Sequence, residues 1–311
     1  MSFLKYVFVV LFITFLAGCV SGPKRTPFTN QTVSSINDVE LYNLVVQDEI
    51  RPAINISNVS SGMIAGAGGG ALPALIGGMI DSSINKNRVR DAQVAMETFY
   101  YNTEEFNFRD VMAKKINSSI AQSLPFNQSN QPAEAILLDD KAIESRIAKL
   151  APGQALAFTS TFYSFIDNSK SLIIESAVFV FINNKKPTAK KTQPIFFNRY
   201  VAISPSYGNG GVHSMKLWSD SQSKLYRETI ESLTKTLATL ITDDMKAQKD
   251  KYCGKPVKAR LAFMGNRNQA KATQIDHIDH LIRVQDGAGT LYAIPDIDVS
   301  IDPKAKPTKC S

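Results

Sequence analysis

The stretch QALAFTSTFYSFIDNSKSLIIESAVFVFI, residues 154–182, decides the fold of this chain. Apolar residues alternate along both of its halves, which is the period-two pattern of β-strands. Asp167, Asn168 and Ser169 separate the halves, and these residue types favour tight turns. The stretch therefore predicts an antiparallel hairpin with strands over 154–166 and 172–182. The predicted apolar faces consist of Leu156, Phe158, Phe162 and Ile166 on the first strand and Ile174, Val178, Val180 and Ile182 on the second.

A third strand is expected over residues 195–203, so the three neighbours form an antiparallel meander whose apolar face needs a cover. The loop before this strand carries Lys185, Lys186, Lys190 and Lys191. Such a cluster is typical of a solvated hairpin tip. It could also contact anionic lipid headgroups or peptidoglycan carboxylates, and the sequence leaves both interpretations open.

Two amphipathic helices supply the cover. The longer helix is expected to begin at Ser219 or Asp220, and the other covers residues 103–124 and ends before Pro125. Trp218 should anchor the start of the long helix in the core. The apolar stripes are Tyr226, Ile230, Leu233, Leu237, Leu240 and Ile241 in the long helix and Phe108, Met112, Ile116, Ile120 and Leu124 in the other. The predicted class is α+β, an antiparallel meander covered by two helices.

The last part of the chain, residues 251–311, is expected to form a small C-terminal β unit. Its strands are predicted over 260–264, 279–285 and 290–294, with a hairpin turn over 286–289. Asp276, His277, Asp279 and His280 lie close together in the sequence, and these residue types can bind a divalent metal. Their spacing fits polar turn residues at least as well. We therefore predict no metal and no cofactor.

At the start of the chain, Lys5 precedes an apolar stretch over residues 6–16 that ends in Leu16-Ala17-Gly18-Cys19. This ending resembles the lipobox of bacterial lipoproteins. The resemblance implies that residues 1–18 are a cleaved signal peptide and that Cys19 carries a diacylglycerol. Because Val20 stands where Asp would favour the inner membrane, the resemblance also implies an outer-membrane lipoprotein that faces the periplasm.

The sequence downstream of Cys19 changes in composition along its length, and these changes define four segments. Residues 19–35 are polar and rich in Pro, Ser and Thr, which predicts a tether. Residues 36–60 are β-prone and should form N-terminal strands, although Pro52 interrupts them. A glycine-rich apolar segment over 61–81 follows, and the α+β domain is expected over 82–250.

The glycine-rich segment repeats small residues every four positions, at Gly62, Gly66, Gly70, Ala74 and Gly78. In a helix these positions form one stripe along which another helix can approach closely, and the segment resembles the glycine zippers of bacterial envelope proteins. Pro73 and the many glycines oppose a regular helix. A membrane-touching or self-associating segment, soluble packing and disorder therefore all stay open.

The number of cysteines in the chain is consistent with an exported protein. Apart from Cys19 the chain holds Cys253 and Cys310, and two thiols in an oxidising compartment usually pair. We therefore predict a disulfide between them that closes the C-terminal segment.

The composition is that of a moderately basic globular protein, with 44% hydrophobic residues and a formal net charge of +7, and it indicates no nucleic-acid partner. Motifs for hydrolytic, nucleotide or dinucleotide chemistry are absent from the sequence, so we expect no enzyme. The leading hypothesis is a lipid-anchored envelope protein that binds another envelope protein or itself and has a binding or assembly role. The alternatives are a self-associating, membrane-active or pore-associated subunit that uses residues 62–80, and a periplasmic hydrolase that uses His213, His277 or His280.

Overall fold

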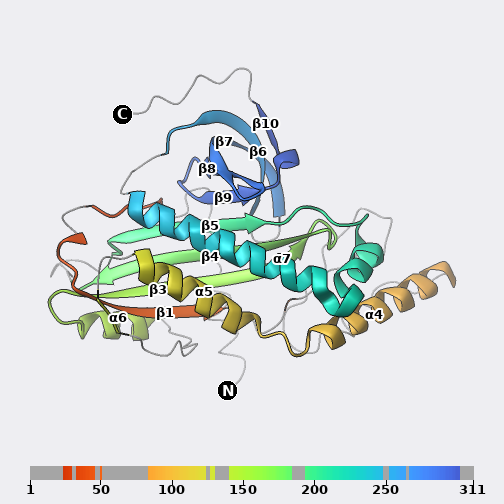
Figure 1. Cartoon of the computed structure of the whole chain (residues 1–311), viewed down its shortest axis with the longest axis horizontal. Helices are drawn as coiled ribbons and strands as arrows, with labels where there is room; N and C mark the ends of the chain where they lie inside the picture. The colour runs from red at the N-terminus through yellow and green to blue at the C-terminus, as the bar shows by residue number, and fades with distance from the viewer. Residues whose placement is uncertain are drawn as a thin grey trace.

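The computed structural model of the chain (Figure 1) describes residues 24–29, 33–45, 50, 83–123, 127–129, 140–183, 193–247, 252–263 and 266–301. Within these ranges, no helix is both long and apolar enough to cross a membrane. The predicted signal peptide and glycine-rich segment lie outside the described residues.

All the described strands belong to one sheet, in the order β10-β6-β7-β8-β9-β5-β4-β3-β1-β2. The central meander of β3, β4 and β5 is antiparallel, as the alternating pattern predicted. The strand bounds are β1 Asp38–Val45, β2 Asn127–Ser129, β3 Gln154–Ile166, β4 Ser171–Ile182, β5 Phe196–Ile203, β6 Lys255–Phe263, β7 Asn266–Ile278, β8 Leu281–Asp286, β9 Leu291–Ile294 and β10 Val299–Ile301.

Helices α5 and α7 run across one face of this sheet (Figure 1), and α4 packs on α7. Helix α4 extends beyond the sheet at the end opposite the C-terminal end of α7. The helices are α4 Ser83–Thr103, α5 Phe108–Ser123, α6 Asp140–Ala148 and α7 Gly211–Ala247, with a short 3-10 helix over Asp296–Asp298. The structure therefore confirms the α+β class.

The sheet is mixed, which corrects the prediction of a purely antiparallel sheet. β1 pairs in parallel with β2 and β3, and β5 pairs in parallel with β9. The last of these pairings joins the C-terminal strands to the central meander, so residues 255–301 continue the same sheet instead of forming a separate unit. Parallel neighbours are far apart in the sequence or separated by crossovers, and no local turn signal announces them.

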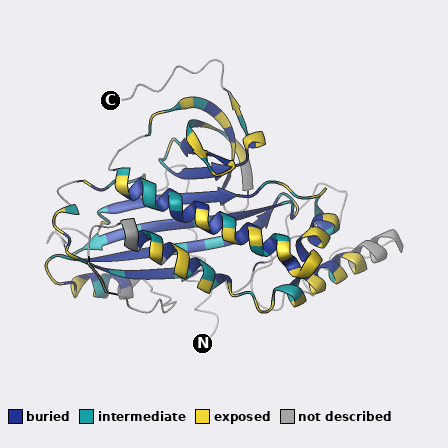
Figure 2. Cartoon of the chain, viewed as in Figure 1, coloured by how far each residue is buried: buried dark blue, intermediate teal, exposed yellow. Residues whose placement is uncertain are grey.

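Both faces of β3 are buried, whereas we expected the helices to cover its Leu156 face. Instead, Leu156 and Phe158 pack with α6 residues on the opposite face, and Ile166 packs with the C-terminal strands on that same opposite face. The helix-facing side of β3 carries Ala155, Ala157, Tyr163 and Phe165. Figure 2 shows the consequence, central strands that are dark blue along most of their length.

Helix α7 consists of two helical segments joined by a kink at residues 220–223. Ser221, Gln222 and Ser223 have φ angles of 50°, 59° and 58°, which lie in the left-handed region. The first segment starts at Gly211, eight residues before the predicted start of the helix, and it holds Trp218 fully buried. Trp218 Nε1 donates to the carbonyl oxygen of Ser169, so this segment is fixed to the turn between β3 and β4.

Residues 24–29 pack on the fold, which corrects the predicted tether over these residues. Thr26 and Phe197 exchange two backbone hydrogen bonds, and Phe28 stacks on Phe196 with 4.6 Å between the ring centroids. Phe28 is 2% exposed. An aromatic side chain and a short backbone bridge thus contribute to holding a segment whose composition is otherwise polar.

Candidate functional site: the Asp244 centre

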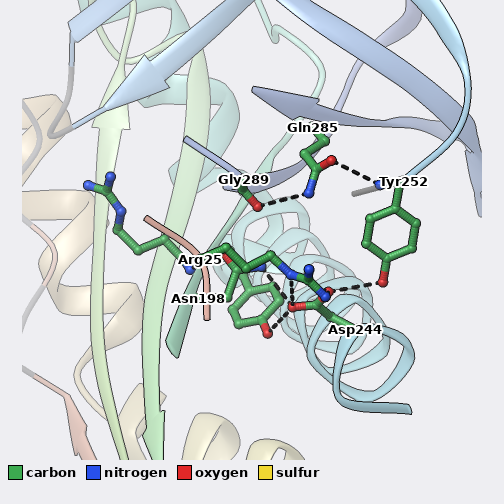
Figure 3. Close-up of polar contacts among 8 residues, drawn as sticks. Arg25, Asn198, Asp244, Tyr252, Gln285 and Gly289 are labelled. Carbon is green, nitrogen blue, oxygen red and sulfur yellow. Dashed lines mark hydrogen bonds and ion pairs between the residues drawn. The ribbon is translucent and has the colours of Figure 1, made fainter. Parts of the chain in front are cut away.

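Asp244 lies near the C-terminal end of α7 and is a buried charge that accepts hydrogen bonds at both of its carboxylate oxygens (Figure 3). Its Oδ1 accepts from Arg25 Nη2 at 2.7 Å, Arg25 Nε at 3.0 Å and the Tyr252 hydroxyl at 3.0 Å. Its Oδ2 accepts from Asn198 Nδ2 at 2.7 Å and the Tyr200 hydroxyl at 2.8 Å. We call these five residues the Asp244 centre.

Four separate parts of the chain meet in this centre. Arg25 comes from the N-terminal segment, Asn198 and Tyr200 come from alternate positions of β5, and Tyr252 precedes β6. Residues two apart on a strand point to the same face, so Asn198 and Tyr200 both reach toward α7. The centre therefore fixes the N-terminal segment and the start of the C-terminal strands to the helix and to the central sheet.

The turn between β8 and β9 closes the centre around Arg25. The backbone N–H of Arg25 donates to the carbonyl oxygen of Ala288. Gly289 has a φ of 94°, and a Cβ atom at this position would lie 2.6 Å from Cβ of Arg25. Glycine is therefore required at 289 both for its conformation and for the close approach of Arg25. Gln285 adds two bonds, to the Tyr252 N–H and to the Gly289 carbonyl oxygen.

Burial governs the electrostatics of the centre. The Arg25 and Asp244 side chains are 2% and 0% exposed, so the pair is almost fully removed from water. Burial, followed by the negative charge of Asp244, raises the pKa of Tyr200 and of Tyr252 above the ordinary value of 10.0. Both hydroxyls therefore stay protonated and can donate to the carboxylate. A buried ion pair gains stability only when its remaining lone pairs are satisfied in this way.

The bonding pattern favours a structural role for Asp244. An ionised carboxylate offers about four lone-pair positions, and donors from described residues already occupy both oxygens. A general base or a metal ligand must instead present an oxygen to a substrate or an ion. The Asp244 centre thus acts as a clamp between distant parts of the chain.

A second ionic group lies beside this clamp. Arg283 of β8 pairs with Asp243 at 2.8 Å and with Asp276 of β7, and its guanidinium lies 5.9 Å from the Tyr252 ring centroid. Hydrogen bonds and the charges of both carboxylates raise the pKa of Arg283 in spite of its burial. This group connects β7 and β8 to the helix next to the Asp244 centre.

Most of the sequence-predicted site residues lie outside the described residues. These are Cys19, Gly62, Gly66, Gly70, Gly78 and Cys310, together with the lysines at 185, 186, 190 and 191. Cys253 is disulfide-bonded. Because Cys310 is not among the described residues, the pairing of these two cysteines stays a prediction.

The three histidines lie on separate elements. His213 is in the first turns of α7, where its Nδ1 accepts from the N–H of Asn209. His277 is near the end of β7, and His280 is in the turn that follows. Asp276 is bonded to Arg283, and Asp279 lies 3.8 Å from Lys235. Within the described ranges, no three His, Cys, Asp or Glu residues gather closely enough to hold a metal ion.

Comparisons of the chain with family models, with characterised proteins and with solved structures found no significant match. No relative therefore assigns a role to the Asp244 centre. Sequence reasoning missed this centre, although one signal was present. Asp244 continues the apolar stripe of Leu237 and Ile241 at a three-residue step, so an acidic residue occupies a core-facing position.

Proposed function

We propose that this chain is a lipid-anchored, non-enzymatic protein of the bacterial cell envelope with a binding or assembly role. Cys19 carries the acyl chains, and the protein sits on the outer membrane and faces the periplasm. The observation that carries the proposal is the Arg25–Asp244 pair, which fixes the fold six residues after the lipobox cysteine.

The short distance along the chain limits how far the fold can move from the bilayer. An extended chain advances at most about 3.6 Å per residue, so Arg25 lies within about 22 Å of the acylated residue. A long flexible tether would let the fold search a wide volume, whereas this arrangement keeps the C-terminal end of α7 next to the membrane. Such a placement suits a protein that holds or orients a partner at the bilayer surface.

The proposed lipid anchor at Cys19 indicates two kinds of partner. The acyl chains bind the membrane, and the fold binds another envelope protein or a second copy of this chain. The saturated bonding of Asp244 supports this non-enzymatic assignment, because this buried carboxylate already has its partners within the protein.

Fractionation of native cells tests the proposal. The wild-type protein should be found in the outer-membrane fraction, and Cys19→Ala should remove it from that fraction. Glu228→Gln keeps the lipobox and changes only an exposed side chain, so it serves as the control and should leave the protein membrane-bound. Recovery of Cys19→Ala in the outer membrane would contradict the proposal. Crosslinking of the native protein in its own membranes, followed by purification, would then identify the partner.

The second candidate is a self-associating subunit that uses residues 62–80. The described residues that flank this region, Ile50 and Ser83, lie at the end of the sheet opposite to Arg25. Ile50 accepts a hydrogen bond from Tyr100 of α4, and Ser83 begins α4. Val94 and Tyr101 of this helix are 54% and 79% exposed, so apolar surface is present at the same end. These positions favour contact with a second copy over insertion beside the lipid anchor.

Size measurement of the acyl-free chain tests the second candidate. Gly66→Leu with Gly70→Leu should lower the oligomer size if the small-residue stripe mediates association. Ala67→Leu with Ala71→Leu adds the same side chains away from the stripe and serves as the control. An unchanged size with the glycine substitutions would contradict self-association through this segment.

A further inference from the structure

Helix α4 carries a stripe of exposed side chains on the side opposite the core. The side chains that pack on the core are Ala92, Ala95, Met96 and Phe99. The exposed side chains on the other side, which we call the α4 stripe, are Arg90, Val94, Glu97 and Tyr101. They follow one another at steps of four, three and four residues, so they lie along one line on a helix with 3.6 residues per turn.

The apolar members of the α4 stripe are unusual for a position that faces solvent. Val94 and Tyr101 are 54% and 79% exposed, and they are two of the four large hydrophobic side chains that are exposed in the described part of the chain. Valine and tyrosine also form helices less readily than alanine, lysine or glutamate does. Their separation of seven residues is the repeat of a seam between two helices. Both side chains therefore indicate that another helix covers the stripe.

The charged members of the α4 stripe are complementary to each other. Arg90 and Glu97 lie on either side of Val94, and neither has an ion-pair partner among the described residues. When a second α4 lies antiparallel on the first, with a two-fold axis beside Val94, Arg90 of each copy lies level with Glu97 of the other. A parallel pair would instead oppose like charges. Asp91 is also exposed, but it lies at the edge of the stripe. The stripe therefore matches a second copy of itself in the antiparallel direction.

The position of α4 in the fold leaves space for this second copy. The first turns of α4 extend beyond the sheet (Figure 1), whereas Ala92 and Phe99 pack on the core. Because the α4 stripe is opposite the core face, the bodies of two paired copies lie on the two outer sides of the helix pair. The first turns of one α4 then lie level with Tyr101 of the other. Helical turns without tertiary packing are marginally stable in water, and the second helix supplies that packing.

We propose that two copies of this chain associate through the α4 stripe, as an antiparallel pair of α4 helices. This inference rests on the proposed binding role, whose partner it names, and it depends neither on the lipid anchor nor on residues 62–80. A single helix pair is smaller than the interfaces of stable complexes, which bury roughly 1,200–2,000 Å², so the association depends on concentration. Acyl chains that hold both copies on one membrane raise their effective concentration.

Sedimentation equilibrium of an acyl-free protein over a concentration series tests the pair. The protein is the whole chain after Gly18 with Cys19→Ser, which retains every described residue and carries no lipid. It should form dimers as its concentration rises. Arg90→Glu and Glu97→Arg should each raise the dissociation constant of the dimer by roughly tenfold or more, because two ion pairs become two contacts between like charges. Arg90→Glu with Glu97→Arg in one chain restores both ion pairs and should restore the dimer.

The matched control is Lys114→Glu, which reverses an exposed charge on α5 and should dimerise like the parent protein. A parent protein that stays monomeric, or a dimer that neither single reversal weakens, would overturn the proposal, as would a double reversal that stays monomeric. A dimer that responds to Gly66→Leu with Gly70→Leu but not to the charge reversals would assign the association to residues 62–80 instead. Because the protein in this test carries no lipid, a monomeric result removes the α4 pair and leaves the proposed lipid anchor unaffected.

Discussion

Arg25 and Asp244 are 219 positions apart in the sequence, yet their side chains form one ion pair that is buried beside the sheet. The pair joins the residues that follow the predicted acylation site to the last turn of α7. Because Asn198, Tyr200 and Tyr252 also donate to Asp244, this pair connects the beginning, the middle and the end of the fold.

Asp244→Asn should destabilise the fold strongly, because it leaves the Arg25 guanidinium buried without a counter-charge. Removing one partner of a buried ion pair costs about 3–5 kcal/mol, and urea unfolding of the acyl-free chain measures the change. Glu228→Gln is the control, since its pair with Lys224 is exposed and contributes about 0.5 kcal/mol or less. If the two substitutions cost the same, the Asp244 centre would not clamp distant parts of the chain together.

The buried tyrosines predict a loss of stability at alkaline pH. Burial raises the pKa of Tyr200 and Tyr252 in the folded state above the value of about 10 that tyrosine has in an unfolded chain. The folded state therefore holds more protons than the unfolded state once the pH exceeds about 10, and the free energy of unfolding falls as the pH rises further. Below that pH the contribution of these groups is constant.

Urea unfolding on both sides of pH 10 measures this dependence. Tyr200→Phe with Tyr252→Phe should make the curve shallower above about pH 10, although it also lowers stability at neutral pH through the lost hydrogen bonds to Asp244. Tyr101→Phe, at a side chain that is 79% exposed, should leave the pH dependence unchanged. An equally steep alkaline loss in the double variant would show that other groups cause it.

Glycine at residue 222 should relieve the backbone strain at the kink of α7. Gln222 is exposed and has a φ of 59°, and a residue other than glycine in a left-handed helical turn costs roughly 1–2 kcal/mol. Gln222→Gly should therefore stabilise the fold or leave it unchanged. Lys235→Gly, at an exposed position in the regular part of the helix, should destabilise it by about 1 kcal/mol. If Gln222→Gly destabilised the fold as much as Lys235→Gly, residue 222 would have an ordinary helical conformation.

The central hairpin could be predicted from the sequence, because its alternating pattern and turn residues are local signals. The strand predicted over 154–166 is β3 with the same bounds, and the strand predicted over 172–182 differs from β4 by one residue. The second segment of α7 followed in the same way from its apolar stripe. In each case the residues that determine the element lie within the element itself.

The parallel pairings and the Asp244 centre could not be predicted in this way, because they join residues that are far apart in the sequence. Val39 pairs with Ala155 across a parallel register, and nothing in either strand specifies that neighbour. Arg25 stands in a polar, proline-containing stretch that resembles a tether, and a single cation there gives no local sign of burial. The kink was missed for a related reason, since Ser221, Gln222 and Ser223 are not the glycines that usually mark left-handed conformations.

The disulfide prediction concerns Cys253 and Cys310. In the mature protein, thiol titration under denaturing, non-reducing conditions should find no reactive thiol, and Cys253→Ser should expose one. The bond would close a long C-terminal loop and stabilise the fold by up to about 4 kcal/mol in the chain-entropy treatment. Two reactive thiols in the unreduced wild-type protein would contradict the pairing.

Mass spectrometry of the N-terminal peptide of the protein purified from its own cells tests the lipid anchor directly. We expect a chain that begins at Cys19 and carries the mass of a diacylglycerol on that residue, with or without a further N-acyl chain. A chain that still contains residues 1–18 and an unmodified Cys19 would contradict the lipid anchor, and with it the proposed placement of the Arg25 end at the membrane.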